Sequence, residues 1–360
     1  MRFVGPLALI DLTALHHNLG VARRHAPKSR LWAVIKADAY GHGMEIAAVA
    51  LARADGFAVA RLEEALRLRA AGVEHPILVL NGALSGEETG AAWEARLDLA
   101  VHQARQADWL AALPASSAGQ PLRIWLKVDT GMHRLGLAPP EVPRLLARLA
   151  DCPAVSHNPG LLTHLANADE PADPLTVLQC QRLRNLAQPG QPLNIGNSAG
   201  LLTCPAARAD WVRPGIMLYG GSPFGDRGAA ELGLRPVMTL KTQLSATHHY
   251  RAGERIGYGG TYACPEDMPV GVAAIGYGDG YPRHAPTGTP VLVKGQRAPL
   301  IGRVSMDSIT LDLRHVPEAR PGDEVILWGQ GLPVEEIATS AGTISYDLLC
   351  GVSPRVRREY

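Results

Sequence analysis

Residues 31–43 read Leu-Trp-Ala-Val-Ile-Lys-Ala-Asp-Ala-Tyr-Gly-His-Gly, and the predicted fold rests on this stretch. The apolar run 31–35 is typical of a buried strand, and residues 44–53 after the glycine-containing turn have the spacing of an amphipathic helix. One lysine, Lys36, stands at the carboxyl end of the strand. A partly buried amine in that position can lose its proton and attack a carbonyl carbon. The stretch therefore predicts a βα unit that carries a Schiff-base lysine.

The same βα rhythm recurs through the first two-thirds of the chain. Strands are predicted at 31–35, 57–60, 77–80, 97–101, 123–128, 160–163, 193–195 and 212–218, and helices at 44–53, 62–71, 141–150 and 174–186, among others. Alternating units with continuously apolar strands indicate a parallel sheet covered by helices. Eight units favour an α/β fold, a (β/α)₈ TIM-like barrel over residues 1–232. A doubly wound sheet is the alternative, but no G-x-G-x-x-G follows the first strand.

The pattern changes after residue 233. Short strand-like runs separated by glycine and proline turns occupy 237–248, 270–275, 290–293, 300–301, 308–313 and 324–328. The one clear helical pattern there is 334–341. Residues 233–360 are therefore predicted to form a separate, mostly β domain.

The balance of positive and negative charges argues against some classes of binding partner. Lysine and arginine number 35 against 34 acidic residues, so no basic surface predicts binding to nucleic acid or to an anionic membrane. The five cysteines form no C-x-x-C pair, and neither they nor the histidines have the spacing of a metal site. No apolar run is long enough for a membrane span or a signal peptide core. We expect a cytoplasmic protein without a metal.

Polar side chains follow several of the predicted barrel strands. In such barrels the chemistry lies at the carboxyl ends of the strands, where the loops converge. The residues at those ends are Lys36, Lys127 to Asp129, His164, Asn197 with Ser198, and Arg213. A polar residue at any one of these positions is weak evidence for a site, because strand ends are often polar simply because they meet solvent. Together they predict one site at the barrel mouth.

Several motifs appear in an order and spacing that identify a family. They are Lys36-Ala-Asp-Ala-Tyr-Gly-His-Gly43, Lys127-Val-Asp-Thr-Gly-Met-His-Arg-Leu-Gly136, Thr163-His164, Gly196-Asn-Ser-Ala199, Val212-Arg-Pro-Gly-Ile216, Ile275-Gly-Tyr-Gly-Asp-Gly280 and Arg303-Val-Ser-Met-Asp307. Over essentially its whole length the chain resembles the alanine racemases, which depend on pyridoxal 5′-phosphate (PLP).

The resemblance implies a two-base mechanism for racemisation. Lys36 would hold PLP and also serve as the base on one face of the substrate Cα, and Tyr277 would be the base on the other face. An arginine, Arg213, would face the pyridine nitrogen of PLP, where most PLP folds place a carboxylate. The cofactor-binding residues that the resemblance implies are Lys36, Tyr40, His164, Asn197, Ser198, Arg213, Gly215, Ile216 and Tyr346.

The resemblance also implies a substrate site and an assembly. Arg134 and Met306 would contact the alanine carboxylate, and Lys127 matches a lysine that is carbamylated in many members. A head-to-tail homodimer would form composite sites, with Tyr277 and Met306 coming from the partner's β domain. The expected activity is interconversion of L- and D-alanine, for peptidoglycan or for catabolism. Alternatives are a racemase of broader specificity, an amino-acid decarboxylase, and a noncatalytic PLP-binding homeostasis protein.

Overall fold

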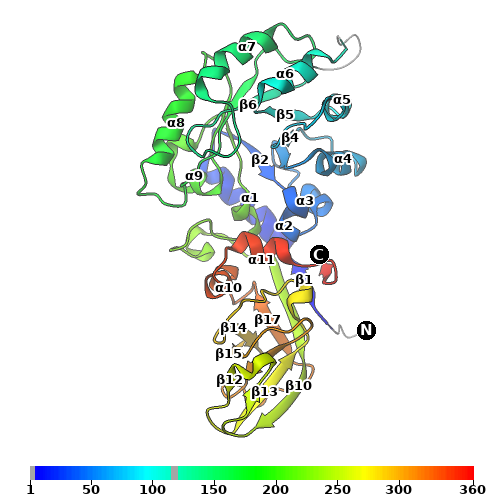
Figure 1. Ribbon diagram of the computed structural model, residues 1–360, viewed down its shortest axis with the longest axis vertical. Helices are drawn as coiled ribbons and strands as arrows, with labels where there is room; N and C mark the ends of the chain where they lie inside the picture. Colours follow the sequence, from blue (N-terminus) through cyan, green and yellow to red (C-terminus); the bar gives the residue numbers. More distant parts are fainter. Residues whose placement is uncertain (1–4, 115–120) are drawn as a thin grey trace. The chain divides into compact units, whose positions relative to one another are not determined.

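The computed structural model describes residues 5–114 and 121–360, and the chain divides into two compact units. The barrel unit comprises residues 16–39 and 43–218. The β unit comprises residues 5–15, 40–42 and 219–360 of the described chain. Figure 1 shows the helices and strands of each unit.

The barrel unit contains a closed parallel barrel of eight strands. The strands are β2 (Arg30–Val34), β3 (Gly56–Val59), β4 (Ile77–Val79), β5 (Asp98–Val101), β6 (Ile124–Lys127), β7 (Gly160–Leu162), β8 (Leu193–Asn194) and β9 (Trp211–Val212). The helices between them include α3 (Met44–Ala50), α4 (Leu62–Ala70), α5 (Gly86–Glu94), α6 (Ala104–Ala111), α7 (Val142–Ala150), α8 (Leu175–Leu186) and α9 (Ser198–Thr203), and α1 (Leu12–His25) precedes β2. The predicted (β/α)₈ fold is confirmed.

One predicted strand is wrong. Residues 212–218 do not form a single strand, because β9 ends at Val212 and the 3₁₀ helix η3 (Ile216–Tyr219) follows. Pro214 has no N–H to donate to a neighbouring strand, and only its carbonyl still bonds to β2, accepting from the Val34 amide at 3.0 Å. The local apolar pattern of residues 216–218 reflects burial inside the protein, which a helical turn satisfies as well as a strand.

The segment after Lys36 has an uncommon backbone conformation. Residues 37–40, none of them glycine, have φ between 52° and 55° inside the short helix α2 (Lys36–Gly41). A left-handed conformation costs roughly 1–2 kcal/mol for each residue that has a Cβ atom. Such strain persists only where the surroundings fix it.

Tryptophans fill part of the barrel interior. Trp32 on β2 stacks on Trp211 on β9 with ring centroids 4.4 Å apart, and Trp125 on β6 meets the Trp32 ring edge-on at 6.5 Å. Glycines on adjacent strands make the room, since a Cβ at Gly56 would lie 2.3 Å from Trp32 and one at Gly160 2.5 Å from Trp125. The barrel is thus a packed core rather than a pore.

The β unit is built on an eight-stranded sheet in the order β13-β16-β15-β14-β17-β10-β1-β18, with a further β13–β10 pairing. Its strands are β1 (Leu7–Ile10), β10 (Met238–Tyr250), β13 (Met268–Ala273), β14 (Pro290–Val293), β15 (Gln296–Ile301), β16 (Ile309–Asp312), β17 (Glu324–Trp328) and β18 (Arg357–Glu359). A separate hairpin joins β11 (Arg255–Ile256) and β12 (Tyr262–Ala263), and the helices are α10 (Val334–Ala341) and α11 (Ser345–Gly351). Antiparallel pairing dominates, and the unit is mostly β, as the turn-rich sequence predicted.

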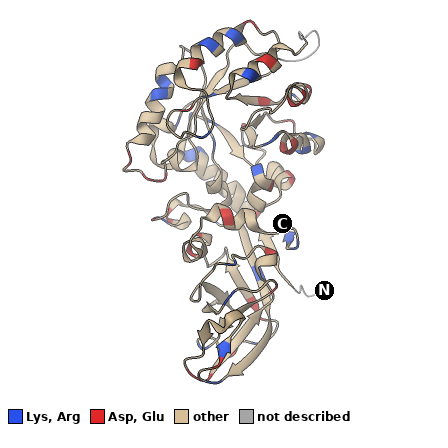
Figure 2. Ribbon diagram, viewed as in Figure 1, with Lys and Arg blue, Asp and Glu red and all other residues tan. Residues whose placement is uncertain are grey.

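Charges of both signs are spread over the outer helices of the barrel (Figure 2). Helix α4, for example, has Glu63 and Glu64 in its first turn and Arg67 and Arg69 in its last, which complements the helix dipole. Within the described chain, no helix has the length and apolar character needed to cross a bilayer.

Candidate active site

The structure places the predicted polar residues of the barrel unit at the carboxyl ends of its strands. Lys127 is the last residue of β6, and Arg213 directly follows β9. Lys36 and His164 each lie two residues beyond the ends of β2 and β7. Since all strands of a parallel barrel end on one face, these four side chains belong to one mouth.

Arg213 is fixed by a dense set of hydrogen bonds. Its Nη1 donates to the carbonyl and side-chain oxygens of Asn194, and its Nη2 donates to the carbonyls of Thr163 (2.6 Å) and Ile195 (3.1 Å). The side chain is buried, and burial lowers its pKa to about 9, so it stays protonated at neutral pH. No acceptor among the described residues takes the Nε–H of Arg213. The guanidinium therefore has one directed donor left for a ligand.

His164 is neutral in this environment. Burial, and then the charges of Arg213, Arg134, Lys127 and Lys36, hold its pKa well below the usual value. Its Nδ1 lies 3.5 Å from Nη2 of Arg213, a separation at the limit of a hydrogen bond. A neutral imidazole can accept there through Nδ1 and donate through Nε2.

Lys127 is 7% exposed and is surrounded by cations. Burial first, then Arg213, Arg134 and Lys36, lowers its pKa to about 8. None of the groups that shift the pKa of Lys127 or of His164 is a carboxylate. The mouth of the barrel is thus a cluster of positive charge that suits anionic ligands.

A polar network that the sequence analysis missed supports the backbone of His164. Gln179 on α8, fully buried, donates to the His164 carbonyl at 3.0 Å and to the Thr130 hydroxyl at 3.2 Å. The hydroxyls of Thr130 and Thr163 lie 2.7 Å apart. The available signal was an amide side chain on the inward face of a predicted helix, since buried amides need partners.

Ser198 and Asn197 have different local roles. The Asn197 side chain caps α9 by accepting from the Gly200 amide at 2.9 Å. The Ser198 hydroxyl instead accepts from the amides of Gly215 (2.9 Å) and Met217 (3.4 Å). The loop after β8 and the loop after β9 therefore meet at Ser198, which gathers backbone donors at one point.

Two further predicted residues come together in the β unit. The rings of Tyr40 and Tyr346 have centroids 5.9 Å apart, and Tyr40 also stacks on Tyr219 at 4.7 Å. Burial is the largest cause that raises the pKa of Tyr40, so its hydroxyl is a hydrogen-bond donor at all ordinary pH values.

Tyr277 and Met306 also come together in the β unit. The amide of Tyr277 donates to the Ser305 carbonyl at 3.0 Å, and the amide of Gly278 donates to the Met306 carbonyl at 2.9 Å. Both side chains project into solvent, Tyr277 being 40% and Met306 52% exposed.

The structure adds a second exposed tyrosine next to this pair. Tyr258, 67% exposed, stands in a glycine turn whose positions 257 and 259 face Arg303, three residues before Met306. The segment 302–306 therefore touches the turns of both tyrosines. Tyr258 was not singled out from the sequence, although it lies in the glycine-rich run Ile-Gly-Tyr-Gly-Gly at 256–260.

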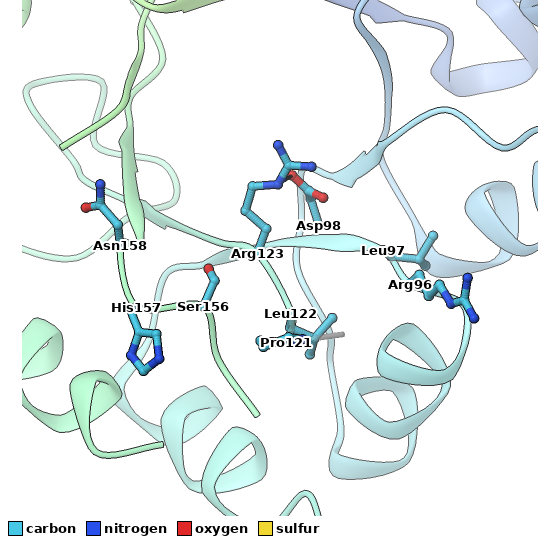
Figure 3. Close-up of a pocket in the computed structure, with 9 residues that line it drawn as sticks. All are labelled: Arg96, Leu97, Asp98, Pro121, Leu122, Arg123, Ser156, His157 and Asn158. Carbon is cyan, nitrogen blue, oxygen red and sulfur yellow. Dashed lines mark ion pairs between the residues drawn. The ribbon is translucent and has the colours of Figure 1, made fainter. Parts of the chain in front are cut away.

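A cavity of about 450 Å³ lies at the opposite end of the barrel, at the amino ends of its strands (Figure 3). There Arg123 pairs with Asp98 at 3.0 Å, and the Trp125 indole donates to the same carboxylate. Figure 3 shows His157 and Asn158 pointing in opposite directions. The side chains drawn there do not point to one common position, and the ion pair joins the start of β5 to the residue before β6.

Comparisons with known proteins agree over the whole chain. The N-terminal domain of alanine racemase matches residues 10–223, and the C-terminal domain of alanine racemase matches residues 237–360. An alanine racemase of Nitrosococcus oceani is 54% identical over 353 residues, which cover 98% of each chain.

Solved structures give the same result. The biosynthetic alanine racemase of Pseudomonas aeruginosa superposes with a TM-score of 0.94 at 47% identity, with 99% of each chain covered. The alanine racemase of Bartonella henselae with covalently bound pyridoxal phosphate has a TM-score of 0.89 at 29% identity, covering 99% of this chain and 100% of that one. With both domains matched in order and relatives similar over their full length, the chain belongs to the alanine racemase family and is an isomerase that racemises alanine.

Proposed function

We propose that the chain binds PLP covalently through Lys36 and interconverts L- and D-alanine with two bases, Lys36 and a tyrosine of the β unit. The observation that carries this proposal is the state of Arg213, a buried, protonated guanidinium with four backbone or amide acceptors and one remaining Nε–H donor. The covalent PLP of the Bartonella henselae relative supports the choice of cofactor.

The residues present fit a PLP molecule. An anionic phosphate needs hydrogen-bond donors, and the Ser198 hydroxyl, which accepts from the Gly215 amide, still has its own proton to donate. The cofactor-binding set is Lys36, Tyr40, His164, Asn197, Ser198, Arg213, Gly215, Ile216 and Tyr346. The mouth also has the positive charge that both a phosphate and a substrate carboxylate require.

The chemistry that PLP supplies when bound is an electron sink for the carbon acid at Cα. Arg213 keeps its proton, so its Nε–H would donate to the pyridine nitrogen of bound PLP and would leave that nitrogen unprotonated. The electron sink would be weaker as a result, which would favour prompt return of the proton to Cα over transamination. A decarboxylase would be expected to use a carboxylate at this position.

Proton transfer requires one base on each face of Cα. Lys36, once its amine is released, serves one face. For the other face the family resemblance implied Tyr277, and Tyr258, whose turn contacts the same segment 302–306, is a second exposed tyrosine of the β unit. We favour Tyr258, because a base that must reach a site outside its own unit needs a projecting side chain and Tyr258 is the more exposed of the two.

Arg134 and Met306 are the proposed contacts of the substrate carboxylate. Arg134 is exposed and makes no hydrogen bond to any described residue, so its guanidinium is available for a bidentate pair. With its pKa lowered to about 8 by burial and nearby cations, Lys127 has a neutral amine at neutral pH far more often than an ordinary lysine. That amine can add CO₂, and the resulting carbamate would pair with Arg134. A free Lys127 amine by mass spectrometry in bicarbonate buffer would contradict this assignment.

The product, D-alanine, is compatible with two physiological roles. D-alanine serves peptidoglycan synthesis, or its racemisation opens a catabolic route, and the biosynthetic relative from Pseudomonas aeruginosa favours the first. The noncatalytic PLP-binding alternative is wrong, since the racemase C-terminal domain matches residues 237–360. A racemase of broader specificity remains the second candidate.

The test is turnover in D₂O. Purified protein loaded with PLP is incubated with L-alanine, L-serine or L-lysine, and the products are separated by chiral chromatography. We expect D-alanine with deuterium at Cα and little turnover of the other two. Comparable rates for serine or lysine would establish the broader specificity, and CO₂ release or no turnover would reject the proposal.

A further inference from the structure

The strained turn after Lys36 needs an external support. Residues 37–40 all carry a Cβ atom and all have left-handed φ values. This conformation is unfavourable for each of them, so the isolated segment would relax to a right-handed or extended backbone. Such relaxation would change the direction in which the neighbouring Lys36 side chain leaves the strand.

The carboxylate of Glu64 contacts the backbone at the start of this turn. Its Oε1 accepts a hydrogen bond from the Ala37 amide at 2.7 Å. Its Oε2 accepts from the amides of Ala60 (2.7 Å) and Arg61 (3.1 Å), which lie between β3 and α4. One side chain thus ties the residue after Lys36 to the end of the neighbouring barrel strand.

Helix capping explains only part of this arrangement. Glu64 is the third residue of α4, and an acidic side chain there commonly returns to the amide of the capping residue. That role accounts for the contact of Oε2 with Arg61. It does not account for Oε1, which is directed to an amide 27 residues away in the sequence.

The remaining supports act farther from Lys36. Asp38 accepts from the amides of Met44 and Gly43 through its side chain and its carbonyl, and Arg67 pairs with Asp38 at 3.5 Å. These contacts fix the end of the turn against α3. Among the described side chains, Glu64 is the one that holds the peptide immediately after Lys36.

We propose that Glu64 is a positioning residue for Lys36: its Oε1 holds the left-handed turn so that the Lys36 amine is presented to the PLP aldehyde. The attachment forms a C=N bond between the lysine nitrogen and the aldehyde carbon and releases one water. This inference rests on the proposed role of Lys36.

The decisive variant is Glu64→Gln. A glutamine can still cap α4 through its oxygen, since Gln is also accepted at that position. Its NH₂ group would then face the Ala37 amide, donor against donor. The substitution therefore removes the contact with Ala37 and retains the cap. Glu63→Gln is the matched control, because Glu63 is adjacent, exposed, and makes no hydrogen bond to any described residue.

The readout is PLP attachment, separate from turnover. Each variant is titrated with PLP, the C=N bond is reduced with borohydride, and the modified peptide is quantified by mass spectrometry. We expect attachment at Lys36 to weaken on the order of tenfold in Glu64→Gln, the usual effect of losing one hydrogen bond to a charged group. Glu63→Gln should match the wild type. In Glu64→Gln, the kcat for alanine should fall by a larger factor than the factor by which KM changes.

Stability measurements distinguish a loss of PLP attachment from a loss of folding. Circular dichroism and the thermal midpoint confirm that each variant is folded, and Glu64→Asp serves as a second variant that keeps the charge but is too short to reach Ala37. Wild-type attachment in a folded Glu64→Gln, or equal losses in both glutamine variants, would overturn the inference. Absence of PLP on Lys36 in the wild type would instead overturn the proposed function.

Discussion

At the scale of single residues, the mouth of the barrel shows which predictions a sequence supports. Lys36, Lys127, His164 and Arg213 could be named because strand ends follow from the apolar pattern, and polar residues at those ends must share one face. The hydrogen bonds of Arg213 could not be predicted, since they run to backbone carbonyls whose positions depend on the closed barrel. Gln179 was missed for the same reason, because only the folded barrel brings its hydrogen-bond partners, Thr130 and the His164 carbonyl, close to it.

The lowered pKa of Lys127 predicts a pH dependence of stability. Between pH 8 and 10.5 the unfolded chain binds a proton on this lysine that the folded chain has released. Stability contributed by Lys127 therefore rises with pH across that window, by at most about 3 kcal/mol. Urea unfolding in CO₂-free buffers from pH 8 to 10 measures it. Lys127→Met should lack this component, and an identical pH slope in both proteins would refute the assignment.

The two tyrosines give a second prediction at this scale. Tyr258→Phe should lower kcat/KM for L-alanine by about 10²–10⁴, the usual contribution of a general base, whereas Tyr277→Phe should lower it less than about tenfold. Initial rates in both directions, with the thermal midpoint of each variant as the control for folding, provide the measurement. The reverse ranking would restore Tyr277, the residue named from the sequence.

At the scale of elements, strands and helices with a clear period were predicted well, and short or long-range elements were not. The failed strand at 212–218 shows that an apolar run specifies burial but not the backbone conformation. Strand β1 was not predicted at all, because its place depends on pairing with β10 some 230 residues later. The left-handed turn at 37–40 contradicts local preference, and only its contacts explain it.

The glycines beside the tryptophans yield a prediction about the barrel core. Gly160→Ala would place a methyl group 2.5 Å from the Trp125 ring, so the strands or the indole must shift. We expect a loss of about 1–3 kcal/mol in the free energy of unfolding. Gly90→Ala is the control, with an expected effect of opposite sign. Gly90 lies within α5 and no atom lies near the position of a Cβ atom, so alanine there should raise the free energy of unfolding by about 0.5–1 kcal/mol. Urea midpoints that move together for both variants would contradict the packing argument.

At the scale of the whole molecule, the sequence pattern indicated an α/β barrel and a β-rich segment because their hydrophobic periods differ. The sequence pattern could not show which further residues complete the active site at the barrel mouth. The barrel unit supplies the cationic mouth, and the β unit exposes the side chains of Tyr258, Tyr277 and Met306. In the homodimer that we propose, each β unit would complete the partner's barrel mouth, which would account for both features.

Mixing two inactive chains tests this arrangement quantitatively. Lys36→Ala lacks the cofactor lysine, and Tyr258→Phe lacks the proposed base. In a mixed dimer with composite sites, one site has both defects and the other has none. Random exchange makes half of the dimers mixed, so activity should recover to about a quarter of the wild-type rate. Native mass spectrometry verifies the exchange, and a mixture of Lys36→Ala with itself is the blank. Verified mixed dimers with no activity would show that each chain completes its own site, and the same mixing with Tyr277→Phe asks which tyrosine crosses between the chains.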